Sequence, residues 1–226
     1  MAGAPTDSSI PDRLTPLQHD LLREFFAREQ RLFLTGGAAL VGYDFGHRTT
    51  DDLDLFTNPP MTLDEPERTL GDVASALGAT VTSLSRHADF RRLQVDRGQE
   101  RCIVDLVVDR APLIDARKRQ VGAVRLDTRR EMAANKVAAL VGRSEVRDLV
   151  DLQVLLEAGQ SLDLALADAA RKDAGVDPAT VGWTLEQLHL GPEARLPGGV
   201  DAVALDRFRA DLVLRLRKAA RAQAGD

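Results

Sequence analysis

The first half of the chain mixes helical and strand patterns. Apolar residues recur at helical spacing after residue 15, where a threonine and a proline are typical of a helix start. Other segments alternate apolar and polar residues or form short apolar runs, which predicts strands. We expect helices from residue 15 and over 38–43 and 64–77, and strands over 31–34, 52–56, 81–84, 90–95, 101–108 and 121–126. This order indicates an α+β fold with a mixed or antiparallel sheet.

From residue 128 the pattern is nearly all helical. The periodicity predicts helices over 130–142, 145–158, 162–171, 178–188 and 203–220. We therefore expect three parts: a disordered tail over 1–14, an α+β domain over 15–127 and a helical domain over 128–226 that completes the site.

Composition is ordinary for a globular protein, with 226 residues, 44% hydrophobic and 29% charged. No apolar run approaches the roughly 18 residues that span a bilayer, and the start lacks the features of a signal peptide. We expect a cytoplasmic protein with no membrane partner. The single cysteine, Cys102, lies in an apolar run and is expected to be a small core residue.

Charge is unevenly distributed along the chain, whose net charge is −5. The segment 117–130 contains six arginine or lysine residues and the single acidic residue Asp127. It could be a landing surface for phosphate or RNA, or equally a solvated hairpin edge. The overall acidity argues against a protein that simply coats nucleic acid.

Two carboxylates alternate with leucines in the expected strand over 52–56. Residues i and i+2 of a strand share a face, so Asp52 and Asp54 should project together. Such a pair suits Mg²⁺, which takes oxygen ligands and keeps sites for water and phosphates. Upstream, Gly36 and Gly37 would let backbone N–H groups approach a phosphate at a helix start. A surface turn and an acidic patch are the simpler alternatives.

A third carboxylate, Asp105, interrupts the apolar run 102–108. A lone buried carboxylate is costly unless it is paired, hydrogen-bonded or bound to metal. If this strand neighbours the one with Asp52 and Asp54, three carboxylates could share one or two Mg²⁺ ions. The alternative is that Asp105 is exposed or pairs with an arginine.

The first helices of the second half carry charge on one face. Lys136 is one of only four lysines and shares a stripe with Arg143. Arg147 and Asp151 stand four residues apart, as in an ordinary helix salt bridge. In a functional interpretation, Lys136 would meet a triphosphate, and Asp151 would orient a base, a metal-bound water or Lys136 itself.

Together these motifs resemble a known family. GGAAL at 36–40 with GHRTTDDLDLF at 46–56 is similar to the first signature of the AbiEii/AbiGii nucleotidyltransferase-like proteins. KVAALVGR at 136–143 with RDLVDL at 147–152 resembles their second. This family belongs to the DNA polymerase β-like nucleotidyltransferase superfamily and supplies toxins of type IV toxin–antitoxin systems, including the MenT proteins.

The resemblance implies an α+β nucleotidyltransferase-like fold, a mixed sheet with flanking helices followed by a helical C-terminal region. It implies that Gly36, Gly37 and Arg48 lie near the nucleotide phosphates and that Asp52 and Asp54 ligate Mg²⁺. One departure is Gly37, which stands where the wider superfamily usually has serine.

By the same resemblance, Asp105 would be the third acidic position, Lys136 would contact the triphosphate and Asp151 would be the later essential acid. The implied reaction moves NMP from an NTP to a hydroxyl acceptor. The acceptor would be RNA, a tRNA 3′ end, and the role that of a toxin with a cognate antitoxin protein. The alternatives are transfer to a small molecule or protein hydroxyl, and a catalytically silent nucleotide-binding module.

Overall fold

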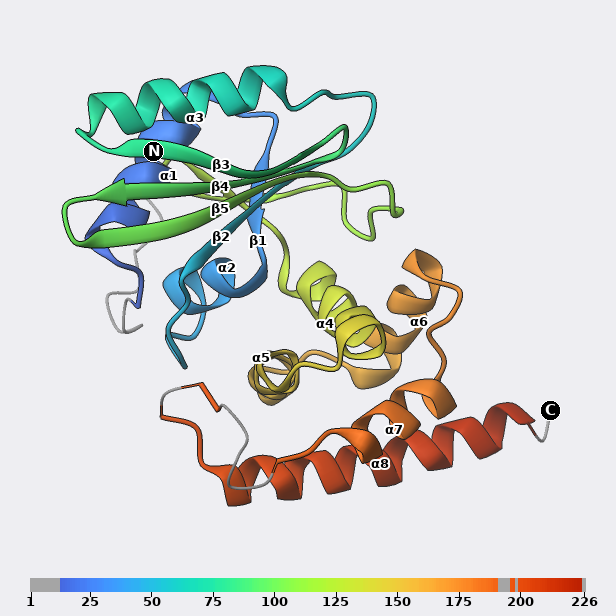
Figure 1. Cartoon of the computed structure of the whole chain (residues 1–226). Helices are drawn as coiled ribbons and strands as arrows, with labels where there is room; N and C mark the ends of the chain where they lie inside the picture. The colour runs from blue at the N-terminus through green and yellow to red at the C-terminus, as the bar shows by residue number, and fades with distance from the viewer. Residues whose placement is uncertain (1–12, 191–195, 198, 225–226) are drawn as a thin grey trace, which may run out of the picture. The chain divides into compact units, whose positions relative to one another are not determined.

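The computed structural model of the chain describes residues 13–190, 196–197 and 199–224. The expected tail over 1–14 therefore lies, except for its last two residues, outside the described residues. The chain divides into two compact units, one comprising 1–110 and 118–127 and the other 111–117 and 128–226. Each unit is described by itself below (Figure 1).

The first unit is a mixed sheet with three helices. A capping box at Thr15 begins the first helix, as the sequence predicts: its hydroxyl accepts from the Gln18 N–H, and the Gln18 side chain accepts from the Thr15 N–H. The helices are α1 (Pro16–Arg28), α2 (Gly36–Tyr43) and α3 (Asp64–Ala76). The strands are β1 (Phe33–Thr35), β2 (Asp52–Thr57), β3 (Thr80–His87), β4 (Phe90–Arg97), β5 (Glu100–Val108), β6 (Arg119–Val121) and β7 (Val124–Leu126).

The strand order is β3-β4-β5-β2-β1-β7-β6. The β2–β5 and β1–β7 pairs are parallel, and the other neighbours are antiparallel, so the sheet is mixed. This confirms the expected fold class. In β2, buried residues alternate with partly exposed ones, so Leu53 and Leu55 face the core while Asp52 and Asp54 face the other way.

The core of this unit lies between the leucine face of the sheet and the helices α1 and α3. Those helices contribute buried apolar side chains such as Phe25, Phe26, Leu70 and Val73, and α3 runs alongside β3 (Figure 1). Cys102 is buried in β5, and burial first, then the charge of Asp52, raises the pKa of its thiol to about 12. The thiol is a core group, as expected.

The prediction of one strand over 121–126 is wrong. The chain forms a hairpin instead, with β6 and β7 joined at Gly122, whose φ is 58°. Only glycine adopts such a positive φ without strain, so the turn falls inside the apolar run that resembled a single strand.

The second unit is helical. Its helices are α4 (Arg129–Arg143), α5 (Val146–Glu157), α6 (Leu162–Lys172), α7 (Pro178–Gln187) and α8 (Ala202–Ala224), close to the expected ranges. Helix α4 packs against α5, α6 and α7, and α7 packs along α8. The segment 111–117 joins this unit because the Glu131 carboxylate accepts the backbone N–H groups of Ile114 and Asp115. No helix in the described part of the chain is both long and apolar enough to span a membrane.

Candidate active site

Three charged side chains form a row across the sheet, on the face opposite α1 and α3. The strand register places Asp54 of β2 beside Asp105 of β5, and Asp105 beside Arg92 of β4. The guanidinium of Arg92 binds both oxygens of Asp105, with Nε 2.9 Å from Oδ1 and Nη2 2.7 Å from Oδ2. The Asp105 side chain is 7% exposed and that of Arg92 47%, so the pair is open to solvent from the arginine side.

Arg92 balances the negative charge of this face. Its hydrogen bonds to Asp105 raise the pKa of Arg92 despite partial burial, and the charges of Asp52 and Asp54 act in the same direction. The guanidinium therefore lies within electrostatic range of all three carboxylates. Of the two possibilities for Asp105, a shared metal site or an arginine pair, the structure displays the arginine pair.

The donor chemistry of Asp52 and Asp54 fits a magnesium ion. Both carboxylates lie on one face of β2, and the Thr50 hydroxyl donates a hydrogen bond to Asp52 Oδ1. Among the described residues, no three His, Cys, Asp or Glu side chains are grouped so that they could hold a metal ion. Two carboxylates still suffice for Mg²⁺, which is commonly bound by one or two carboxylates together with substrate phosphates and water.

Gly36 lies directly against this acidic face. It begins α2 with φ 65°, a region that favours glycine, and a Cβ at this position would lie 2.0 Å from Asp54 Oδ2. The register between β1 and β2, which pairs Thr35 with Asp54, brings the two together. The start of a helix, with its unsatisfied N–H groups, thus adjoins a carboxylate suited to a metal.

Gly37 makes room for Arg48. A Cβ on Gly37 would lie 2.6 Å from Arg48 Nη2 and 3.1 Å from Thr50 Oγ1. Arg48 is 5% exposed, and its Nη1 donates to the Thr49 carbonyl at 2.9 Å. The departure from serine at this position therefore has a physical reason, because the guanidinium fills the space that a serine side chain would occupy.

In the helical unit, Lys136 lies in a buried ion cluster. Its Nζ is 2.9 Å from Asp148 Oδ1 and 2.7 Å from Asp151 Oδ2, and both aspartates are fully buried. Arg143, on the same stripe of α4 as Lys136, binds both oxygens of Asp148 at 2.7 Å. The contact with Lys136 fits one of the roles considered for Asp151, that of orienting this lysine.

The cluster keeps its members charged. Burial alone would lower the pKa of Lys136, but the carboxylates of Asp151 and Asp148 outweigh it and raise the pKa above its ordinary value. Burial likewise opposes ionisation of Asp148, but Arg143 and Lys136 hold the pKa of that carboxyl below its usual range. At neutral pH the cluster therefore contains a lysinium ion and ionised Asp148.

The basic segment 117–130 does not form one exposed strip. Lys118 is buried, and its Nζ lies 2.8 Å from Asp127 Oδ1. Asp127 also accepts a hydrogen bond from the Thr35 hydroxyl. Two of its arginines are held by buried aspartates, Arg119 by Asp44 and Arg130 by Asp168, each at 2.7 Å. The prediction of a single RNA-facing strip is thus wrong for Lys118. Residues 119–126 instead form the hairpin that was the alternative interpretation.

Two residues of these clusters were not among the sequence candidates. Arg92 could have been found from the turn at Gly98, because a short turn between two strands fixes their register and places Arg92 beside Asp105. Asp148 shares the inner face of α5 with Asp151, three residues away, which is a detectable signal.

Comparisons with known proteins agree with this architecture. The structure is similar to that of JHP933 from Helicobacter pylori, with a TM-score of 0.56 and 19% identity over 92% of this chain and 94% of that one. It is also similar to MenT4, nucleotidyltransferase toxin Rv2826c from Mycobacterium tuberculosis H37Rv, with a TM-score of 0.54 and 17% identity over 88% and 80%. These likenesses show a nucleotidyltransferase-like fold.

The family is established by sequence. The model of the nucleotidyl transferase AbiEii toxin family, of type IV toxin–antitoxin systems, matches residues 20–224. The chain therefore belongs to this family, which confirms the resemblance drawn from its motifs, and it is a nucleotidyltransferase of the toxin type. No curated protein matches the chain.

Proposed function

We propose that this chain transfers a nucleoside monophosphate from an NTP to a hydroxyl group of RNA, with Mg²⁺ as cofactor. The acceptor hydroxyl gives up its proton to solvent, a bond forms between its oxygen and the α-phosphorus, the bond from that phosphorus to the β-phosphate oxygen breaks, and pyrophosphate leaves with the electron pair. The single observation that carries the proposal is the contact between the α2 start and the acidic face. Gly36, which can present backbone N–H groups to phosphate, adjoins Asp54 of the carboxylate pair.

Asp52 and Asp54 would hold the ion, with Asp105 available as a third position once it leaves Arg92. Bound there, Mg²⁺ would offset the negative charge that develops on the transferring phosphate. Thr50 restrains one oxygen of Asp52 by donating a hydrogen bond to it.

The nucleotide phosphates would be bound by the start of α2. Gly36 and Gly37 begin this helix without side chains, so no side chain of their own would separate a phosphate from the backbone N–H groups, and Arg48 adds a cation beside Gly37. Because Arg48 is buried against the glycine and fixed to the Thr49 carbonyl, its charge is preorganised rather than recruited from solvent.

We assign Lys136 and Asp151 to the same reaction. Lys136 would supply positive charge to the triphosphate, and Asp151 would keep it protonated and in position. Both are buried in a four-residue cluster, so variants need a stability measurement beside the activity. Lys136→Arg tests charge with altered shape, and Asp151→Asn tests the positioning carboxylate.

The RNA acceptor, a tRNA 3′ end, and the growth-inhibiting role are proposed from family membership and the motif resemblance. A cognate antitoxin protein would be the natural partner of such a toxin. Transfer to a small molecule or a protein hydroxyl is the competing outcome, and it is distinguished below by where the label appears.

The test is a labelling experiment. The protein is incubated with each α-³²P-NTP, Mg²⁺ and total tRNA, beside Asp52→Asn/Asp54→Asn and a matched control, Asp51→Asn. Asp51 is an exposed neighbour, so its substitution removes one negative charge beside the proposed ligands without touching them. We expect label on tRNA with the wild type and Asp51→Asn and none with the double variant. Label on protein only, or on no acceptor, would refute the RNA proposal.

A further inference from the structure

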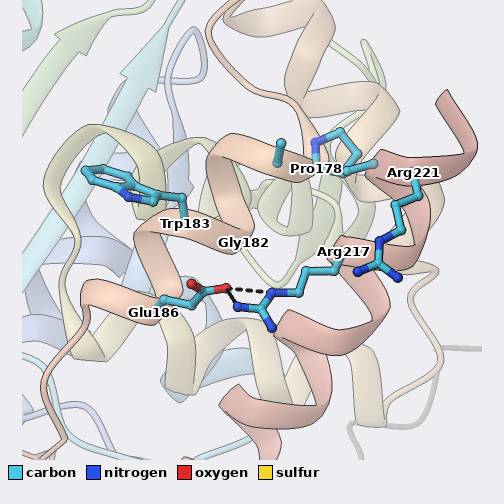
Figure 2. Close-up of a pocket in the computed structure, with 8 residues that line it drawn as sticks. Pro178, Gly182, Trp183, Glu186, Arg217 and Arg221 are labelled. Atoms are coloured by element: carbon cyan, nitrogen blue, oxygen red, sulfur yellow. Dashed lines mark hydrogen bonds and ion pairs between the residues drawn. The ribbon is translucent and has the colours of Figure 1, made fainter. Parts of the chain in front are cut away.

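The surface formed by α7 and the C-terminal half of α8 combines an exposed aromatic ring with a run of cations. Trp183, the only tryptophan of the chain, is 64% exposed on α7. It lines a cavity of about 330 Å³ whose other walls include Gly182 and Glu186 of α7 and Arg217 and Arg221 of α8. Figure 2 displays these side chains on the two neighbouring helices.

The charge of α8 is concentrated in this part of the helix. From Leu212 to Gln223 it contains four cations and no acidic residue, and all four are exposed: Arg215, Arg217, Lys218 and Arg221. Glu186 forms a 2.7 Å ion pair with Arg217, and Asp163 and Asp177 line a neighbouring cavity with Ala219 and Ala222 of the same helix. Arg217 and Arg221 stand one helical turn apart, about 6 Å along the axis, so positive charge recurs along the helix.

The floor of the cavity is apolar and shallow. Small side chains from Pro178, Ala179 and Ala220 line it. Gly182 lies close to α8, where a Cβ would be in ordinary van der Waals contact with the Leu216 Cβ at 3.5 Å. A flat group that enters this cavity would therefore meet small apolar side chains rather than displace a large one.

We infer that this α7–α8 surface binds single-stranded RNA. An exposed aromatic ring beside arginines is the combination on which unpaired bases stack while cations neutralise the backbone. An acidic polypeptide would also meet the cations, but its carboxylates offer no apolar face to the exposed indole of Trp183. The inference deepens the proposed function, because it names a surface by which an RNA acceptor would be held.

Binding can be measured apart from catalysis. Trp183 emission is recorded during titration with a 12-nucleotide RNA of unpaired sequence, with fluorescence anisotropy of labelled RNA as the second readout. Because the chain has one tryptophan, quenching reports this site alone. Stacking on aromatic side chains contributes about 1–3 kcal/mol per base, so Trp183→Ala should weaken binding about 5- to 150-fold, and Trp183→Phe should retain most of it.

The cations are tested by salt dependence. Each phosphate contact on a single strand contributes about 0.7 to the slope of log K against log salt, so Arg217→Gln/Arg221→Gln should lower the slope by about 1.4. The control, Arg23→Gln/Arg110→Gln, removes the same charge from exposed residues of the other unit and should leave binding unchanged. Circular dichroism verifies that each variant is folded.

The outcomes separate the two proposals. RNA binding that depends on Trp183 and the two arginines supports the inference even if no label reaches RNA. Unchanged affinity and slope in the folded variants would overturn it, even if RNA is labelled. Displacement of the RNA by polyglutamate at an equal concentration of negative charge would also overturn the inference, because it would favour an acidic protein partner.

Discussion

Replacing Lys136 with methionine tests the buried cluster of the helical unit. The change removes the cation that lies 2.9 Å and 2.7 Å from two buried carboxylates. With an effective dielectric constant of about 20, each contact corresponds to about 6 kcal/mol of attraction. Most of this is offset by the cost of burying the charges, and losing one member of a buried pair typically costs about 3–5 kcal/mol.

The unpaired buried charge in the variant should be that of Asp151, because Arg143 still binds Asp148. We therefore expect the free energy of unfolding to fall by about 3–5 kcal/mol at pH 7. The assay is urea unfolding followed by circular dichroism, with Trp183 emission as a probe within the helical unit. The control is Arg28→Met, which breaks an exposed pair with Glu24 and should cost less than about 1 kcal/mol.

The pH dependence gives the sharper test. Without Lys136, the aspartates that it neutralised are driven toward their protonated forms. The difference in free energy of unfolding between the wild type and the variant should therefore become smaller as the pH falls toward 4. A variant within 1 kcal/mol of the wild type at pH 7 would refute this reasoning.

Three further predictions concern single positions. The pKa of Asp148 is lowered in the folded chain, so the ionised carboxylate stabilises the fold fully above the unfolded pKa of about 3.9, and this stabilisation is lost as the pH falls below that value. The difference in free energy of unfolding between the wild type and Asp148→Asn, measured by urea unfolding, should therefore be constant from pH 5 to 8 and become smaller in more acidic solution. Gly36→Ala should lower the melting temperature, because Gly36 has a positive φ and the new Cβ would clash with the Asp54 carboxylate. Gly71→Ala, at a helical position with open space, should instead raise stability by about 0.5–1 kcal/mol. Arg92→Gln frees Asp105 and should tighten Mn²⁺ binding measured by electron paramagnetic resonance; unchanged affinity would contradict competition between the guanidinium and a metal.

Local pattern was sufficient for most of the fold. Alternation over 52–57 placed Leu53 and Leu55 in the core and both aspartates on the other face, because only the core side of the strand requires apolar residues. A hairpin within 117–130 was one of two alternatives, but its turn at Gly122 was not located, because the turn has no asparagine or aspartate and apolar residues continue on both sides of it.

The sites were predictable only in part. Residue types and spacing identified Asp54, Asp105 and Lys136 as candidates, but the partners of these groups depend on contacts across strands and between helices. The β4–β5 turn contains enough information to pair Arg92 with Asp105. The contact of Lys136 with Asp148 depends on how α4 packs against α5, and helical periodicity defines faces without defining that register.

The path of the chain between its units has a consequence for experiments on separate pieces. The polypeptide leaves the sheet unit after residue 110, contributes 111–117 to the helical unit and returns to form the β6–β7 hairpin before leaving again. A piece that ends at residue 127 would carry the anchored loop without Glu131, which binds it, and one that ends at 110 would lack the strand beside β1. No single cut separates the units intact, so truncation at one position cannot yield each unit whole.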